Sequence, residues 1–222
     1  MNDYLSALQS EFEARADSKI ALEQKAYLRD QFAFYGIKTP VRRNIQKPFL
    51  ITALLPPKDN LQNLVRTLWG KPQREYHYFA QELAQKYVKQ FEKEDIALFE
   101  FMVTQNSWWD TVDSIATKLI GPYFKKFPEQ RDPITTKWMA SENIWLQRCC
   151  LLFQLLWKEG MDTVFLEHTI SALLSSDEFF INKAIGWILR QYSRTDADWV
   201  IDFVGRTPLK PLIKRKALKL IP

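Results

Sequence analysis

The chain has 222 residues, which is long enough for one large domain or a short array of repeats with a buried core. Hydrophobic residues make up 46% of the sequence and charged residues 26%, an ordinary globular composition that excludes a largely disordered chain. The formal net charge is +5 and the isoelectric point is near 9.1, which weakly favours a polyanionic partner such as nucleic acid.

The N-terminal segment, residues 1–19, predicts an amphipathic helix rather than a secretion signal, because no long apolar run follows its charged residues. No stretch approaches the roughly 18 apolar residues that a membrane-spanning helix needs. Cys149 and Cys150 are adjacent, poorly placed to bridge to each other and followed by two leucines, so we expect reduced thiols that serve packing. These features predict a cytoplasmic protein without membrane contact.

Helix-start signals and prolines divide the rest of the sequence into short helices. Thr39-Pro40 and Asp132-Pro133 each place a capping side chain before a proline, a combination typical of a helix start. The segments between prolines run about 10 to 18 residues, which suits paired antiparallel helices. There are only six glycines and no clear alternating strand pattern. We therefore predict an all-α chain that forms a single domain over residues 1–222.

The predicted helices recur at a comparable phase with a period of 35 residues. Counting from Asp113 in steps of 35 reaches Tyr78 and Arg43 in one direction and Arg148 and Lys183 in the other. A near-constant period of two helices is the signature of an α-solenoid of the HEAT or armadillo type, here on the short side of the usual repeat length. Because the second helices of such a stack usually line one face, residues at one phase are expected to form a stripe along a concave basic groove.

The segment 179–194 predicts a helix with separate apolar and basic faces. The apolar stripe consists of Ile181, Ala184, Ile185 and Ile188. The basic face consists of Lys183, Trp187, Arg190 and Arg194. A tryptophan in a helix more often belongs to the core than to a site, but Trp187 lies among cations, so both interpretations stay open.

In the segment 108–119, Trp109 and Asp113 lie one turn apart, beside an apolar stripe. That stripe consists of Trp108, Val112, Ile115 and Leu119. Asp113 is either a surface acid, one half of a salt bridge between packed helices, or the acid at the centre of a charged groove. Arg148 lies on a helix that is apolar almost all round, so we expect it to bury its stem and pair with a carboxylate such as Asp113.

Other chemistries lack their residues. His77 and His168 lie 91 residues apart without suitably spaced cysteines or acids, so no metal site is expected. Glycine-rich phosphate loops and G-x-S-x-G elbows are absent, and we expect no cofactor. Cys149 has apolar surroundings, which predict an inert thiol. A carboxylate flanked by indoles on a basic face is the remaining candidate for chemistry.

Four separated motifs resemble a known family. FYGIKTPVRR (34–43), SWWDTVDSI (107–115), NIWLQR (143–148) and FFINKAIGWILR (179–190) closely resemble the AlkD family of bacterial DNA alkylation repair proteins, HEAT-like-repeat DNA glycosylases. The similarity extends from the first helix to about residue 218, and the motifs occur in the family's order. Relatives that lack glycosylase activity lose a short N-terminal helical element, whereas this chain carries residues 23–37 ahead of its T-P-x-R-R motif.

The resemblance implies a C-shaped solenoid that holds duplex DNA in its concave basic surface. It implies hydrolysis of the N-glycosidic bond of cationic N3- and N7-alkylpurines, a step of base excision repair, with the base left in the duplex. The family's active-site positions correspond to Trp109, Asp113 and Trp187, and the arginine of its motif to Arg148. The partner would be double-stranded DNA containing alkylated purines, bound by a monomer in the bacterial cytoplasm and nucleoid.

Basic side chains are expected to contact phosphates and position the duplex without reading its sequence. The expected contacts are Arg42, Arg43, Lys183, Arg190, Arg194, Lys214 and Arg215. The basic segment 210–221 suits a solubilising final helix about as well. Two other functions stay open: a non-catalytic binder of DNA structure that has no use for Asp113, and a peptide-binding scaffold in which Trp187 anchors a partner helix.

Overall fold

The computed structural model describes residues 2–221, and it is helical throughout, with no β-strand in that range beyond one isolated bridge between Ala33 and Gln73. This confirms the predicted all-α class. The single domain expected over residues 1–222 stays a prediction, and two compact units are described within the chain, unit 1 (Met1–Phe91) and unit 2 (Glu92–Pro222).

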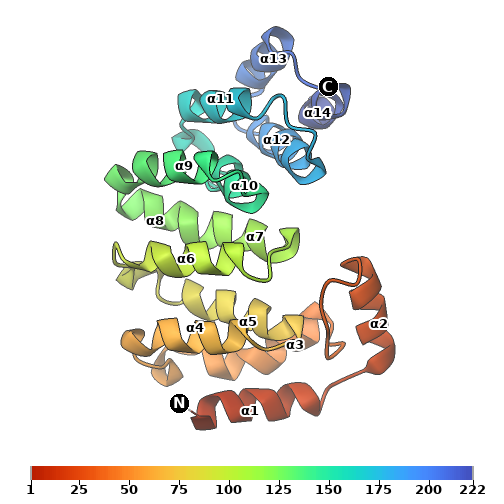
Figure 1. The fold of residues 1–222 in the computed structure, drawn as a ribbon, viewed down its shortest axis with the longest axis vertical. Helices are drawn as coiled ribbons and strands as arrows, with labels where there is room; N and C mark the ends of the chain where they lie inside the picture. The colour runs from red at the N-terminus through yellow and green to blue at the C-terminus, as the bar shows by residue number, and fades with distance from the viewer. Residues whose placement is uncertain (1, 222) are drawn as a thin grey trace. The chain divides into compact units, whose positions relative to one another are not determined.

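Unit 1 contains five α-helices within the described residues (Figure 1). They are α1 (Asn2–Glu13), α2 (Ser18–Tyr27), α3 (Thr39–Gln46), α4 (Leu61–Trp69) and α5 (Arg74–Gln85). Short 3-10 turns at Lys47–Leu50, Thr52–Leu54, Lys58–Asn60 and Val88–Gln90 join or follow them. Leu8, Leu64 and Phe79 are fully buried, so the core of this unit lies between α1, α4 and α5.

Unit 2 is a stack of helix pairs (Figure 1). Its helices are α6 (Asp95–Thr104), α7 (Trp109–Ile115), α8 (Gly121–Lys126), α9 (Arg131–Ala140), α10 (Ile144–Leu152), α11 (Thr163–Ala172), α12 (Phe179–Tyr192), α13 (Ala197–Arg206) and α14 (Pro211–Ala217). A π-helical turn, Ala116–Ile120, joins α7 to α8 without a break. Further 3-10 turns lie at Pro128–Gln130, Lys158–Gly160 and Leu218–Leu220.

The 35-residue period is a property of the second helix of each pair. Helices α3, α5, α7, α10 and α12 begin at residues 39, 74, 109, 144 and 179, so each begins 35 residues after the one before. Asp113, Arg148 and Lys183 are therefore the fifth residues of α7, α10 and α12. This confirms the prediction that they lie on the second helices of consecutive repeats.

The apolar stripes predicted for α7 and α12 are buried, with one exception. Val112, Ile115 and Leu119 are fully buried, and so are the four residues of the α12 stripe. Trp108 is only partly buried, because it precedes α7 in an extended conformation (φ −159°, ψ 157°), where a helical wheel does not apply. Its ring packs instead against Trp145 and Phe180, with centroids 5.7 and 5.1 Å away.

The two helix starts expected from proline differ in detail. Helix α3 begins at Thr39 itself, after Lys38, and no side chain caps it. Helix α9 begins at Arg131, ahead of the expected cap Asp132, because the 3-10 turn before it runs directly into the helix. The Asp132 carboxylate accepts a hydrogen bond from Arg131 Nε at 2.7 Å and is not available to the helix end.

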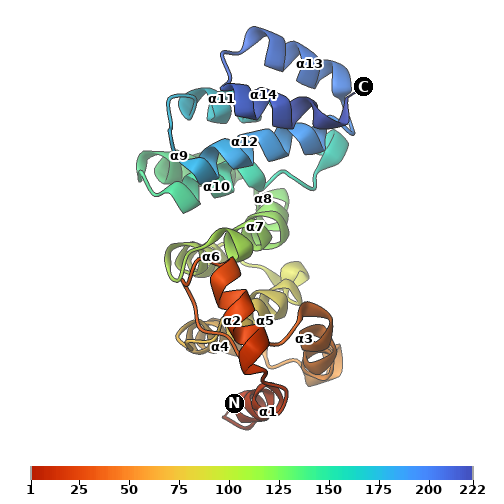
Figure 2. The ribbon, with the colours of Figure 1, turned by 90° about the vertical axis from the view of Figure 1, so that its right-hand side faces the viewer.

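Helix α2 stands to one side of the other helices of unit 1, and none of its residues is buried (Figures 1 and 2). The segment that follows α2 is held to the rest of unit 1 by Glu75, a buried residue of α5 whose carboxylate accepts hydrogen bonds from three main-chain N–H groups. Oε1 accepts from Gly36 at 3.0 Å and Ile37 at 3.2 Å, and Oε2 accepts from Tyr35 at 3.1 Å. Gly36 has φ +88°, and an added Cβ would lie 2.0 Å from the carbonyl oxygen of Asp17, so only glycine fits there.

Candidate active site

Asp113 and Arg148 form an ion pair between α7 and α10. Arg148 Nε donates to Asp113 Oδ1 at 2.7 Å, and Nη2 donates to Oδ2 at 2.9 Å. Arg148 Nη1 donates to the carbonyl oxygen of Phe180 at the start of α12. The Arg148 side chain is 5% exposed, and that of Asp113 is 15% exposed. One buried guanidinium thus joins three consecutive second helices, as the wheel of α10 predicted, and the carboxylate still reaches the surface.

The surroundings of Asp113 act on its pKa in opposite directions. Burial, the largest effect, raises the pKa because the charged form loses hydration. The hydrogen bonds and charge of Arg148 lower it, and the nearby charge of Asp110 raises it. The net result is a raised pKa. The protein therefore holds a carboxylate in a poorly hydrated place and keeps it there with one matched cation.

A cavity of about 220 Å³ adjoins this ion pair. It is lined by Arg148, Lys183, Gly186, Trp187, Arg190 and Lys216, which come from α10, α12 and α14. Helices α12 and α14 lie side by side in this unit (Figure 2). Four of the six lining residues are cationic, so the cavity has a positive electrostatic potential. The Asp113 carboxylate is hydrogen-bonded to Arg148, which is one of these four residues.

The predicted site residues are placed as follows. Lys183 and Trp187 lie with Arg148 in the cavity wall, and Asp113 joins them through the ion pair. Trp109 is the first residue of α7, one turn before Asp113, and is partly exposed, but it is not one of the residues that line the cavity. The structure therefore brings four of the five residues together in unit 2.

The predicted phosphate contacts are not all at the surface. Arg190 lines the cavity, Arg194 is exposed just beyond the end of α12, and Lys214 and Arg215 lie on α14 outside the cavity. Arg43 is exposed on α3, in unit 1.

Arg42 is the exception, and the prediction of an exposed phosphate contact is corrected. Its side chain is 6% exposed, because the guanidinium donates to Glu82 Oε1 at 3.0 Å and to Gln46 Oε1 at 2.7 Å. Lys216, in contrast, was not predicted and lies in the cavity wall. The only signal for it in the sequence was the basic character of segment 210–221.

The two cysteines of the chain lie in the core of unit 2. Cys149 and Cys150 are free and buried, and burial raises the pKa of the Cys149 thiol well above its ordinary value, so both serve packing as predicted. In residues 2–221 no three His, Cys, Asp or Glu side chains are grouped so that they could hold a metal ion. No helix in that range has the length and apolar character needed to cross a bilayer.

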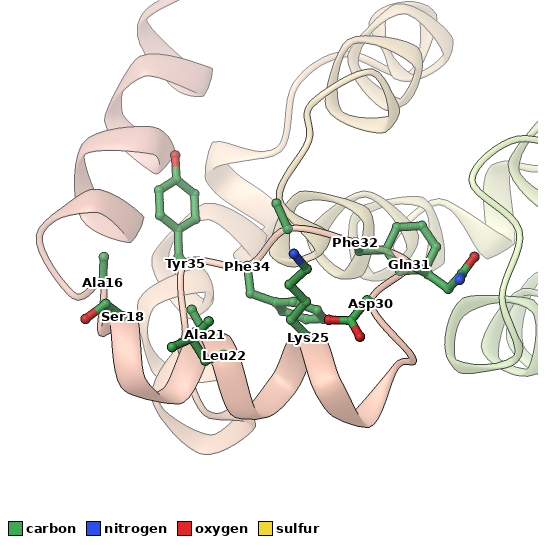
Figure 3. Close-up of a pocket in the computed structure, with 11 residues that line it drawn as sticks. Ala16, Ser18, Ala21, Leu22, Lys25, Asp30, Gln31, Phe32, Phe34 and Tyr35 are labelled. Atoms are coloured by element: carbon green, nitrogen blue, oxygen red, sulfur yellow. The ribbon is translucent and has the colours of Figure 1, made fainter.

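A larger cavity, of about 820 Å³, lies in unit 1 between α2 and the segment after it (Figure 3). Leu22, Phe32, Phe34 and Tyr35 give it a mainly apolar lining, and Lys25 belongs to the same lining. None of the predicted site residues lies in it. Its size alone does not make it the better candidate, because it lacks the paired carboxylate and the grouped cations of the cavity in unit 2.

Comparisons with known proteins give one family. A family model described as "DNA alkylation repair enzyme" matches residues 8–221. Among solved structures, the chain is similar to a predicted DNA alkylation repair enzyme from Enterococcus faecalis, with a TM-score of 0.86 and 34% sequence identity over 93% of this chain and 96% of that chain. None of the curated proteins compared with the chain matches it.

Proposed function

The chain belongs to the DNA alkylation repair enzyme family, and from this premise we propose that it is a DNA glycosylase that hydrolyses the N-glycosidic bond of cationic N3- and N7-alkylpurines in duplex DNA. The family gives the chain a role in DNA repair. The observation that carries the more specific proposal is the Asp113 carboxylate, fixed by Arg148 at the edge of a cationic cavity.

The proposed reaction needs little help with its leaving group. Alkylation at N3 or N7 makes the purine positively charged, so it departs as a neutral base and no general acid has to protonate it. Positive charge develops on the deoxyribose in the transition state, and a fixed negative charge nearby stabilises that state more than the ground state. A site in which one carboxylate is held in place by a matched cation suits such a reaction.

Asp113 is the proposed source of that negative charge. One unit charge about 4 Å away at an effective dielectric constant near 20 contributes roughly 4 kcal/mol, which corresponds to a rate factor on the order of a thousand. The Arg148 cation cancels part of this field, so the contribution is smaller than the unpaired value. Trp109 and Trp187 can present the negative faces of their rings to the sugar, at about 0.5 to 2 kcal/mol each.

The cavity also supports the proposal that the damaged base stays in the duplex. Pockets that enclose a ligand usually measure about 300 to 1,000 Å³ and have mainly apolar and aromatic walls. The cavity beside Asp113 is smaller, at about 220 Å³, and four of its six lining residues are cations. Cations do not suit an alkylpurine that is itself positively charged, but they suit the sugar-phosphate backbone.

A second candidate is a non-catalytic binder of DNA structure on the same scaffold. It is favoured by the observation that both Asp113 oxygens already accept hydrogen bonds from Arg148, as in a purely structural pair. A peptide-binding scaffold has less support, because a groove for a helix should be apolar and the lining of this cavity is mostly cationic.

The test is release of 7-methylguanine and 3-methyladenine from alkylated duplex DNA, with the wild-type protein beside Asp113→Asn. The proposal expects base release that depends on Asp113. Tight binding of the duplex by the wild-type protein without any base release would favour the non-catalytic candidate. If the protein neither binds the duplex nor releases a base, both candidate functions are wrong.

A further inference from the structure

Three cations in the wall of the 220 Å³ cavity have no acidic partner. Arg148 uses its donors on Asp113 and the Phe180 carbonyl. Lys183, Arg190 and Lys216 also line the cavity, and none of them forms a salt bridge with any residue in the range 2–221. Grouped cations without acids repel one another, and this arrangement is typical of a surface that binds an anion.

The repulsion is visible at Lys216. Its pKa is lowered, chiefly by the charge of Lys183, then by partial burial and by the charges of Lys219, Arg190 and Arg215. An anion placed between Lys216 and Lys183 would reverse the largest of these effects. In the free protein the cations of this cavity therefore repel one another, and a bound anion would offset that repulsion.

The position of Lys216 is fixed by the packing of α14 on α12. An added Cβ at Gly186 would lie 2.9 Å from Lys216 Cβ and 3.7 Å from the Ile213 carbonyl oxygen, so a side chain at Gly186 would hold α14 away. Because residue 186 is glycine, Lys216 lies close enough to line the same cavity as Lys183. The cation group is therefore built by close helix packing and is not a chance gathering of mobile surface lysines.

The positive charge of these cations would also oppose the proposed reaction if no anion neutralised it. A sugar that becomes positively charged beside Asp113 would be destabilised by the cations that line the cavity together with Arg148. A negatively charged group in the cavity neutralises them and leaves the field of Asp113 to act on the sugar. The volume permits this, since one water occupies about 30 Å³ of the liquid and the cavity has room for a tetrahedral anion with several waters.

We propose that this cavity binds one phosphodiester of the DNA strand, adjacent to the sugar that faces Asp113, and that Lys216 is a contact residue for it. The inference rests on the proposed function and extends it to α14. Lys183 and Arg190 hold the same phosphate from α12. The phosphate positions the strand, and its charge cancels the cation group that would otherwise oppose the reaction.

The first test follows the pKa of individual lysines. Lysine amines are converted to ¹³C-dimethylamines and titrated by NMR, and the Lys216 signal is identified by its absence in Lys216→Gln. In the free protein the Lys216 signal should titrate below the ordinary lysine pKa of 10.5. An undamaged duplex should raise the Lys216 pKa, whereas the same duplex with uncharged methylphosphonate linkages should not. An unchanged Lys216 pKa with the ordinary duplex overturns the inference.

The second test measures the salt dependence of binding to the undamaged duplex. Lys216→Gln should weaken binding several-fold and reduce the slope of log K against log salt by about 0.9, the value for one phosphate contact. Lys219→Gln is the matched control, since it removes the same charge from an exposed lysine that does not line the cavity. Equal effects of the two variants would contradict a specific contact at Lys216.

A third arm uses inorganic phosphate. If inorganic phosphate raises the Lys216 pKa and the duplex does not, the cavity takes a free anion and the inference about the strand is wrong. None of these measurements requires base release. If the Lys216 pKa and the salt dependence behave as expected but no alkylpurine is released, the phosphate site is supported and the proposed glycosylase activity is wrong. If alkylpurines are released but Lys216 shows neither effect, the glycosylase activity is supported and the phosphate site is wrong.

Discussion

Arg148 holds Asp113 through two parallel hydrogen bonds, of 2.7 and 2.9 Å, between helices that begin 35 residues apart. A two-point bond of this kind fixes the plane of the carboxylate as well as its position. The third donor group of the guanidinium is held by the Phe180 carbonyl, so the arginine cannot turn toward a ligand without breaking the pair. The carboxylate is therefore oriented before DNA arrives, and this preorganisation is what electrostatic catalysis requires.

Asp113→Asn should reduce single-turnover excision of 7-methylguanine by about one to three orders of magnitude, because it removes the charge and keeps the shape. Affinity for the duplex should change little, and the protein should still fold. Asp198→Asn is a matched control, since it neutralises an exposed acid on α13 of the same unit, outside the cavity. Equal losses of affinity and excision in Asp113→Asn would show that the carboxylate organises the surface and not the chemistry.

Excision should rise with pH through the pKa of Asp113, because only the deprotonated carboxylate carries the stabilising charge. Burial raises this pKa above its ordinary value of 3.8, so the acid limb of the profile should lie above that pH. The Asp110 charge contributes to the raised pKa, and Asp110→Asn should therefore move the limb to lower pH. Rates are measured at constant ionic strength after subtraction of spontaneous depurination. A profile that falls as pH rises through this range would assign the titration to another group.

Arg148→Ala should lower the free energy of unfolding by about 3 to 5 kcal/mol, because it leaves the poorly hydrated Asp113 carboxylate without its partner. Arg148→Lys keeps the charge but loses the two-point geometry, so its loss should be smaller. Excision should fall in both variants, since the carboxylate is no longer held. Urea unfolding followed by circular dichroism measures the first effect. A stability of Arg148→Ala equal to that of the wild type would mean that the pair adds nothing to the fold.

Gly186→Ala and Gly205→Ala should have opposite effects on stability. A Cβ at Gly186 meets Lys216 Cβ at 2.9 Å, so α14 must shift and the free energy of unfolding should fall by about 1 to 3 kcal/mol. A Cβ at Gly205, on α13, meets nothing within 4 Å, and alanine should stabilise that helix by up to about 1 kcal/mol. Thermal unfolding of the two variants side by side measures the difference. A neutral Gly186→Ala would indicate that α14 is not held tightly against α12.

Substrate choice should follow the charge of the leaving base more than its size. A cationic purine leaves without protonation, whereas uracil is a poor leaving group even beside Asp113. A lesion that stays in the duplex can project away from the protein, so a bulky N7 adduct should still be removed. Duplexes with 7-methylguanine, a bulky cationic purine adduct or uracil are compared in single turnovers at one salt concentration, because affinity varies steeply with salt. Rapid excision of uracil would point to a base-reading pocket.

Sequence periodicity predicted the centre of the site because a constant 35-residue step preserves the phase of a side chain from helix to helix. Asp113, Arg148 and Lys183 were identified in this way, and the burial of Arg148 was predicted separately from the apolar character of its helix. The step fails at the last pair, since α14 begins 32 residues after α12, and Lys216 was missed for that reason. Its place depends on the close packing at Gly186, which only the tertiary structure shows.

Adjacent basic residues show the same limit on a smaller scale. Arg42 and Arg43 look alike in the sequence, but consecutive residues of a helix point about 100° apart. On α3 this turns Arg43 toward solvent and Arg42 toward Glu82 of α5. Which of the two faces outward depends on where α5 packs, and composition cannot predict that. The partial exposure of Trp108 was missed for a related reason, since the helical wheel assumed a helix that begins one residue before the helix that forms.

Glu75 anchors the segment behind α2 through main-chain N–H groups, which every residue except proline possesses. Because α2 also buries none of its own side chains, the surface of this helix is largely free of constraints from the core. Substitutions there can accumulate while the helix keeps its place in unit 1. Among the described residues, this helix is a region where relatives of the chain can diversify with little loss of folding stability, and a natural place to randomise when new specificities are selected in the laboratory.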